Sequence, residues 1–256
     1  MNTEHVDLGL ARYSDWAFTS SVVVLVCALL LLAIELAYAR GRKVEDRELV
    51  AVGGAVAGDS DRPGVVVDAP RRSFDERVGR SGLALVYLGI ALLFACIVLR
   101  GLATSRVPWG NMYEFINLTS FCGLIAAAVV LRRQQYRALW VFVLVPVLIL
   151  LTVSGRWLYS HAAPVMPALQ SYWLPIHVSV VSLGSGVFLV AGVASILFLL
   201  KMSRFGQPGS DGALNRIVSR LPDAQTLDRI AYRTTIFAFP VFGFGVIFGA
   251  IWAEEA

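Results

Sequence analysis

The chain has 256 residues, of which 57% are hydrophobic and 16% are charged, whereas soluble domains carry about 25% charged residues. This composition excludes an ordinary soluble domain and indicates a protein whose main solvent is lipid. The net charge of +4 comes without a basic stripe interleaved with aromatic residues and without a Gly-rich phosphate loop, so we expect a lipid bilayer as partner and no nucleic acid.

Six stretches approach the about 20 mostly apolar residues that cross about 30 Å of hydrocarbon. They are residues 16–38, 82–99, 115–131, 139–153, 178–200 and 234–253. The first stretch follows an acidic tail and is too long for the apolar part of a signal peptide, so we interpret it as a span. The sequence therefore predicts an all-α, polytopic bundle of six transmembrane helices.

The distribution of basic residues predicts how the bundle is oriented. Eighteen of the 22 Lys and Arg residues fall in residues 39–81, 132–138 and 201–233, and four fall in the alternate segments. Because cytoplasmic loops retain Lys and Arg, we expect both ends of the chain to lie on the extracytoplasmic side.

The N-terminal part divides into three predicted segments. Residues 1–15 form an extracytoplasmic tail, residues 16–38 the first span, and residues 39–81 a flexible cytoplasmic loop rich in Gly and charged residues. Glu35 lies about one turn from the inner end of the first span. We expect it to reach the interface or to pair with Arg40, and a proton-relay role is the alternative.

The three cysteines, Cys27, Cys96 and Cys122, each lie within a predicted span, and the chain contains no CxxC pair. Cysteines within membrane spans typically pack as small buried hydrophobic residues. A membrane thiol–disulfide relay requires paired reactive cysteines, so the sequence excludes that class.

Five of the six tryptophans lie at or beyond predicted outer helix ends: Trp16, Trp109, Trp157, Trp173 and Trp252. An aromatic belt explains Trp residues at either membrane interface. A one-sided cluster of indoles is also suited to stacking on a flat apolar ligand. Both interpretations stay open on composition alone.

Two polar residues among these aromatics are candidates for chemistry. Glu114 stands just before the third span with Asn111, Trp109 and Tyr113 upstream, and interfacial structure alone is the alternative interpretation. His177 lies at the outer mouth of the fifth span, beside Trp173. It is either a satisfied interfacial residue or a ligand for a metal or haem. None of the three histidines lies mid-membrane, which argues against a haem clamped between two spans.

The last segments combine a cytoplasmic connection with a closely packed span. Residues 214–221 repeat apolar residues at helical spacing, which predicts a short interfacial helix. Gly245 and Gly249 form a small-residue face in the sixth span, and Pro240 is predicted to kink it.

Four segments together resemble the System II cytochrome c biogenesis proteins of the CcsA/ResC family, called CcsB in actinobacteria. They are 109–115 (WGNMYEF), 167–178 ending at His177, 227–233 (LDRIAYR) and 249–256 (GAIWAEEA). The resemblance covers residues 82–256, which makes this range a cytochrome c assembly-type membrane domain.

The resemblance implies a multi-pass protein of the bacterial cell membrane that handles haem b at its outer face. It implies a ResB-like membrane partner and presentation of haem to the Cys-x-x-Cys-His motif of apocytochrome c. Holocytochrome c synthase (haem lyase) activity is expected only of such a complex, with no catalytic residue in this chain. His177 matches an external histidine that ligates the haem iron, and Trp173, Trp109, Trp252, Tyr113 and Glu114 are the other expected haem-binding residues.

In the family pattern a Trp-rich external segment, a second external histidine and two more spans follow the position of Ala256. We therefore expect the chain to be truncated before that segment. Two other functions remain as alternatives: a membrane transporter of a small amphipathic substrate, and a structural respiratory-assembly subunit without a cofactor.

Overall fold

The computed structural model describes residues 6–52, 74–163, 171–203, 218 and 220–255. Its helices are α1 (Leu8–Val52), α2 (Phe74–Thr104), α3 (Met112–Val130), the short 3₁₀ helix η1 (Gln134–Tyr136), α4 (Leu139–Trp157), α5 (Trp173–Met202) and α7 (Ala224–Glu255). Within these residues six helices are long and apolar enough to cross a membrane, and there is no strand. The prediction of an all-α, six-span, multi-pass membrane protein is confirmed.

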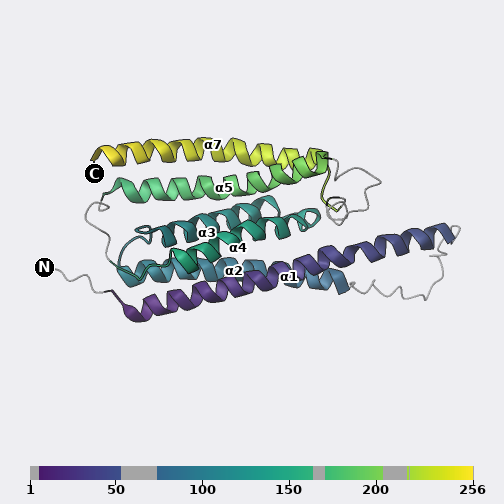
Figure 1. Ribbon diagram of the computed structural model, residues 1–256, viewed down its shortest axis with the longest axis horizontal. Helices are drawn as coiled ribbons and strands as arrows, with labels where there is room; N and C mark the ends of the chain where they lie inside the picture. Colours follow the sequence, from purple (N-terminus) through teal and green to yellow (C-terminus); the bar gives the residue numbers. More distant parts are fainter. Residues whose placement is uncertain (1–5, 53–73, 164–170, 204–217, 219, 256) are drawn as a thin grey trace, which may run out of the picture.

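The helices form three antiparallel pairs stacked in layers, with α1 and α2 in one outer layer, α3 and α4 in the middle, and α5 and α7 in the other outer layer (Figure 1). Because the number of crossings is even, α1 begins and α7 ends at the same end of the bundle (Figure 1). This end, called the terminal end below, carries the candidate site. The extracytoplasmic placement of this end stays a prediction.

Most helices extend beyond the apolar stretches from which they were predicted. The helix α1 begins at Leu8 and continues to Val52. Residues 8–15 of the predicted tail and residues 39–52 of the predicted loop are therefore helical. Polar residues are accommodated because their side chains bond to neighbouring helices: Ser14 and Ser21 donate to the carbonyls of Cys96 and Gly89 on α2. The predicted flexible segment 53–73 and most of the predicted helix 214–221 lie outside the described residues.

Close helix contact in the middle of the bundle depends on glycine. A Cβ atom added to Gly186 on α5 would lie 2.5 Å from the backbone nitrogen of Gly123 on α3, which no side chain tolerates. Small residues bring helix backbones together where lipid gives no hydrophobic drive for association. The main apolar core contains residues from all six long helices and includes Trp140 of α4, which is almost completely buried.

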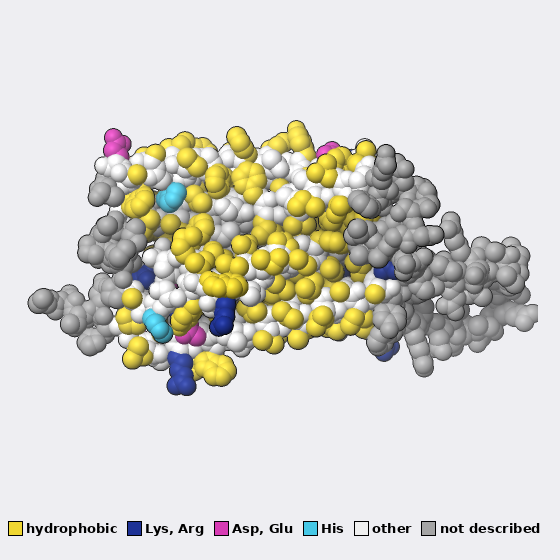
Figure 2. Space-filling model, viewed as in Figure 1, with side chains coloured by type: hydrophobic (Ala, Val, Ile, Leu, Met, Phe, Trp, Pro, Cys, Tyr) yellow, Lys and Arg dark blue, Asp and Glu magenta, His cyan; other side chains and the backbone are white. Residues whose placement is uncertain are grey.

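The outward faces of the helices are apolar, as contact with lipid tails requires. Figure 2 shows hydrophobic side chains across the middle of one such face. On α7 the large exposed side chains include Phe237, Phe239, Phe244 and Ile247. Glu35, near the opposite end from the terminal end, forms an ion pair of 3.0 Å with Arg137, a partner that the sequence did not suggest. The side chain of Arg40 lies outside the described residues.

Candidate functional site

A tight turn at the terminal end sets the geometry of the first group of candidate residues. The helix α2 ends at Thr104 and Ser105 takes a positive φ of 49°. The backbone N–H groups of Arg106 and Ser105 donate to the carbonyls of Gly101 and Leu102, the bonding pattern of a Schellman motif. The chain reverses there and enters α3.

The helix α3 begins with a side-chain cap. Asn111 is its N-cap residue and accepts a hydrogen bond of 2.8 Å from the backbone N–H of Glu114. The Glu114 carboxylate therefore lies in the first turn, where the helix dipole favours a negative charge. These two signals, Asn and then Glu three residues later, explain why α3 starts where it does.

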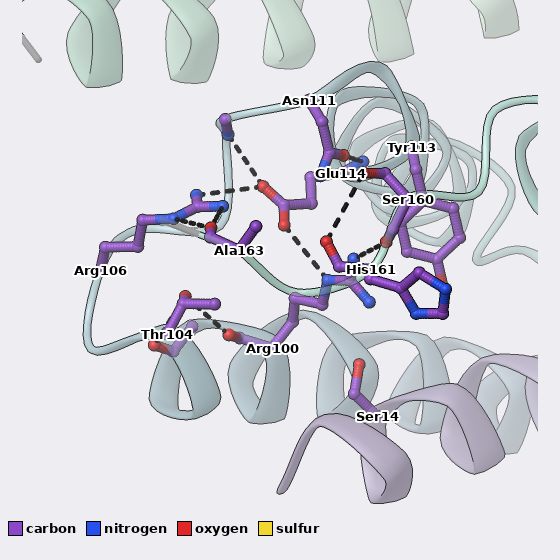
Figure 3. A network of polar contacts seen from close by, with 12 residues as sticks. Ser14, Arg100, Thr104, Arg106, Asn111, Tyr113, Glu114, Ser160, His161 and Ala163 are labelled. Carbon is purple, nitrogen blue, oxygen red and sulfur yellow. Dashed lines mark hydrogen bonds and ion pairs between the residues drawn. The ribbon is translucent and has the colours of Figure 1, made fainter. Parts of the chain in front are cut away.

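Glu114 is the centre of a buried ion-pair network (Figure 3). One carboxylate oxygen accepts from Nε of Arg100 at 3.2 Å, and the other accepts from Arg106 at 3.2 Å and from the backbone N–H of Gly110 at 2.8 Å. Only 1% of the Glu114 side chain and 2% of the Arg100 side chain are exposed. A carboxylate so deeply buried is stable because both of its oxygens accept hydrogen bonds and two cationic side chains compensate its charge.

Arg100 connects this carboxylate to three other elements. It pairs with Asp15 of α1 at 3.4 Å and donates to the backbone carbonyl of Ser160, beyond the end of α4. Its guanidinium lies 5.0 Å from the ring centroid of Tyr113 and 5.8 Å from that of Tyr159. Arg100 therefore holds α1, α2, α3 and the segment after α4 together at the terminal end.

Tyr159 and the neighbouring loop close the network from outside. Its hydroxyl donates to Asp15 at 2.7 Å, and Arg106 donates to the carbonyl of Ala163. Burial, followed by the hydrogen bond to Asp15 and the charge of that carboxylate, raises the pKa of the Tyr159 phenol above its ordinary value. The ring of His161 packs edge-on against Tyr159 (centroids 5.4 Å apart).

The second group of candidate residues lies between α5 and α7. Nδ1 of His177 is 2.7 Å from the carbonyl oxygen of Gly245. A carbonyl only accepts hydrogen bonds, so Nδ1 carries the proton and a neutral imidazole keeps its lone pair on Nε2. Among the described residues no hydrogen bond to Nε2 is found.

Small residues on α7 make room for this imidazole. A Cβ atom on Gly249 would lie 2.6 Å from the His177 ring, and one on Gly245 would lie 2.6 Å from Val181. The predicted small-residue face of the sixth span is thus confirmed as a contact surface with α5. One turn further along α7, the ring of Trp252 lies parallel to His177 within 13°, with centroids 6.5 Å apart.

Two indole N–H groups, one on α7 and one in the turn between α2 and α3, lack a partner among the described residues. Nε1 of Trp252 and Nε1 of Trp109 are buried, and neither has a hydrogen-bond acceptor among the residues that the structure describes. A buried unsatisfied donor costs about 1–3 kcal/mol. Trp173 lies stacked on Phe248 at 6.0 Å and adds an apolar wall beside His177.

Residues 109–256, more than half of the chain, match the family of cytochrome c assembly proteins. The chain belongs to this family. The matched range begins at Trp109 and contains all six residues that the sequence singled out, on α3, α5, α7 and the turn before α3.

Three curated relatives of this family member carry the name cytochrome c biogenesis protein CcsA. The protein of Guillardia theta is 29% identical over 192 residues, which are 66% of this chain and 64% of the relative. Those of Parasynechococcus marenigrum and Thermosynechococcus vestitus are each 30% identical, over 69% and 70% of this chain and 65% and 66% of the relatives. The family member is thus of the CcsA type, and it spans slightly less than two thirds of the length of these relatives.

The structure brings the predicted residues of the family member into two groups at one end of the bundle. His177, Trp173 and Trp252 lie together on α5 and α7. Tyr113 and Glu114 lie in the network around Arg100, and Trp109 is in the turn between α2 and α3. Sequence reasoning missed Arg100 and Asp15, because a basic residue at a helix end was interpreted as a loop charge. The available signal in the sequence was Arg100 at the end of an apolar run, followed 14 residues later by Glu114, the acid that it binds.

The donor set of the family member fits one kind of metal better than others. Among the described residues no group of three or more His, Cys, Asp or Glu side chains is placed to hold a metal ion. This part of the chain therefore offers no set of three protein ligands for a bare metal cation. Iron in a porphyrin already has four nitrogen ligands and needs only an axial imidazole, which His177 can offer.

Proposed function

We propose that this chain handles haem b for cytochrome c maturation, as the CcsA-type membrane subunit of a System II cytochrome c synthase. In this proposal it works with a ResB-like membrane partner. It presents haem at the extracytoplasmic face of the cell membrane to the Cys-x-x-Cys-His motif of apocytochrome c. Both this topology and these partners are parts of the proposal.

The hydrogen bond between Nδ1 of His177 and the Gly245 carbonyl is the observation that supports the proposal most directly. Its Nδ1 proton is engaged by the Gly245 carbonyl, so the lone pair on Nε2 is the ligand that iron accepts. Histidines that bind metals commonly donate their other ring N–H to a carbonyl or carboxylate, which fixes the tautomer and the ring orientation. His177 has this second partner already in place, on the neighbouring helix.

The surrounding aromatic residues suit the rest of a haem molecule. The unpartnered Nε1 groups of Trp252 and Trp109 are donors, and haem carries two propionate carboxylates that accept hydrogen bonds. The rings of Trp173 and Phe248 offer apolar surface for the porphyrin.

Glu114 and Tyr113 contribute, in this proposal, by fixing the turn that carries Trp109. The Glu114 carboxylate accepts from the N–H of Gly110, the residue next to Trp109. Tyr113 packs under Arg100, which in turn binds Glu114. A rigid support of this kind holds a binding residue in its productive position.

The reaction proposed for the complex depends more on the positions of the haem and the thiols than on acid–base groups of this chain. Addition of a cysteine thiol to a haem vinyl group forms one C–S bond and moves the thiol proton to the other vinyl carbon. The part of this chain is to hold the porphyrin edge toward the incoming thiols and to keep the iron ligated by His177.

The test is the visible absorption spectrum of the full-length protein purified in detergent, for wild type, His177→Gly and His161→Gly. His161 is the matched control, because it lies at the same end of the bundle but is exposed. We expect a Soret band in wild type and in His161→Gly, and its loss or shift in His177→Gly. Added imidazole should restore it in His177→Gly by filling the space left by the side chain.

Two results would count against the proposal. One is a folded wild-type protein that carries no haem even with its membrane partner present. The other is a His177→Gly spectrum identical to that of wild type, which would remove His177 as the iron ligand.

A further inference from the structure

A second feature lies at the opposite end of the bundle, far along the helices from His177. A pocket of about 980 Å³ is formed where α3 and α7 flank α5. Its apolar walls include Phe121, Ile125 and Val129 of α3, Leu183 and Val187 of α5, and Phe237 of α7. The haem-handling proposal makes no use of this pocket.

Among the described residues that line the pocket none is acidic, and four are arginines: Arg132, Arg133, Arg229 and Arg233. The first two follow the C-terminal end of α3, and the other two lie in the first three turns of α7. All four are exposed, and within the described part of the chain none forms an ion pair with an Asp or Glu. The pocket thus joins an apolar interior to a concentrated positive charge.

The lengths of the walls indicate the size of the occupant. From Phe121 to Val130 the α3 wall contains ten residues, and its nine steps of 1.5 Å give a length of about 14 Å. From Thr226 to Phe237 the α7 wall contains twelve residues, and its eleven steps of the same rise give a length of about 16 Å. Half of a hydrocarbon core of about 30 Å is about 15 Å. The pocket is therefore as deep as one leaflet.

We propose that this pocket binds an anionic phospholipid of the leaflet at that end of the bundle. The phosphate and its anionic headgroup lie among the four arginines, and the acyl chains run along α3 and α7 toward the middle of the membrane. Basic pockets between transmembrane helices bind anionic headgroups by charge and by hydrogen bonds from the guanidinium groups. Inorganic phosphate matches the arginines but leaves the apolar walls unfilled, so a lipid fits the whole pocket better.

The experiment measures lipid retention by native mass spectrometry, with the full-length protein delipidated in detergent and then given phosphatidylglycerol or phosphatidylcholine. Arg229→Gln/Arg233→Gln removes half of the charge at the pocket. The matched control is Arg77→Gln/Arg80→Gln, which removes two exposed basic residues near the start of α2, at the same end of the bundle and outside the pocket.

We expect wild type to retain phosphatidylglycerol in preference to phosphatidylcholine. One basic residue near the bilayer surface strengthens attraction for anionic lipid about fivefold, so loss of two should weaken retention about twenty- to thirtyfold. The control should retain the lipid as wild type does. Inorganic phosphate added in excess should not displace it, because phosphate lacks the acyl chains.

A third variant tests the apolar part of the pocket. Ala126 lines it on α3, so Ala126→Phe should lower phosphatidylglycerol retention while all four arginines remain. Equal retention of the two lipids, or equal loss in the pocket and control variants, would overturn the proposal and indicate unspecific attraction. Displacement by phosphate, or by added haem instead of lipid, would assign the pocket to another ligand. None of these outcomes depends on the His177 spectrum.

Discussion

Removal of the Glu114 carboxylate is the most direct test of the network at the terminal end. Glu114→Ala leaves Arg100, whose side chain is 2% exposed, without its nearest buried acid, while the interaction with Asp15 at 3.4 Å remains. Breaking a buried pair by removing one partner costs about 3–5 kcal/mol, because the other charge is left without compensation. At about 2–4 °C per kcal/mol for a chain of this size, the expected fall in melting temperature is about 6–20 °C.

The control for this variant is an exposed ion pair of the same type. Glu76 and Arg80 lie 2.9 Å apart on α2, with 31% and 48% of their side chains exposed. Glu76→Ala should cost at most about 1 kcal/mol, because water screens such a pair. Both variants are compared with wild type by intrinsic tryptophan fluorescence during heating in the same detergent.

A double variant separates an uncompensated charge from a simple loss of packing. Arg100→Met/Glu114→Leu removes both charges and keeps apolar volume, and such replacements are often neutral or stabilising. It should be more stable than Glu114→Ala. Equal melting temperatures for Glu114→Ala and Glu76→Ala, or a double variant less stable than Glu114→Ala, would refute the reasoning.

Two further predictions concern the α5–α7 contact and the edge of the network. Gly249→Ala places a methyl group 2.6 Å from the His177 ring, so it should cost about 1–3 kcal/mol of stability and reduce haem retention. Gly243→Ala, which meets nothing within 4 Å, should be neutral or stabilising by up to about 1 kcal/mol in the same melting and spectral assays. The raised pKa of Tyr159 means that its stabilising contribution is complete below pH about 10, where an unfolded tyrosine ionises, and is lost as pH rises toward the folded pKa. Between pH 9 and 11, melting curves should therefore show a smaller loss of stability for Tyr159→Phe than for wild type. Identical pH profiles for the two proteins would contradict a raised pKa of Tyr159 in the folded protein.

The six spans could be predicted because hydrocarbon imposes length and composition on each helix separately. The ends were less predictable. Ser14 and Asp15 are polar, so they were assigned to a tail, yet α1 includes them because their side chains bond to α2. The hydrophobicity of a segment carries no information about hydrogen bonds to a helix that follows about 80 residues later.

The candidate site was predictable only in part for the same reason. His177 and Glu114 were visible as polar residues among aromatics at helix ends. The pairing of Glu114 with Arg100, and of His177 with Gly245, depends on the order and rotation of packed helices. The lipid pocket left no local signal, since its four arginines come from two segments about 100 residues apart and served only to predict orientation.

The hydrogen bond from His177 to Gly245 joins residues 68 positions apart, on two different helices. The imidazole acquires its single tautomer only when α7 has docked against α5. During synthesis α5 is made first, and until α7 arrives the ring is free to protonate at either nitrogen. The tautomer that the proposed iron ligation requires is thus fixed only after the hairpin of α5 and α7 has closed.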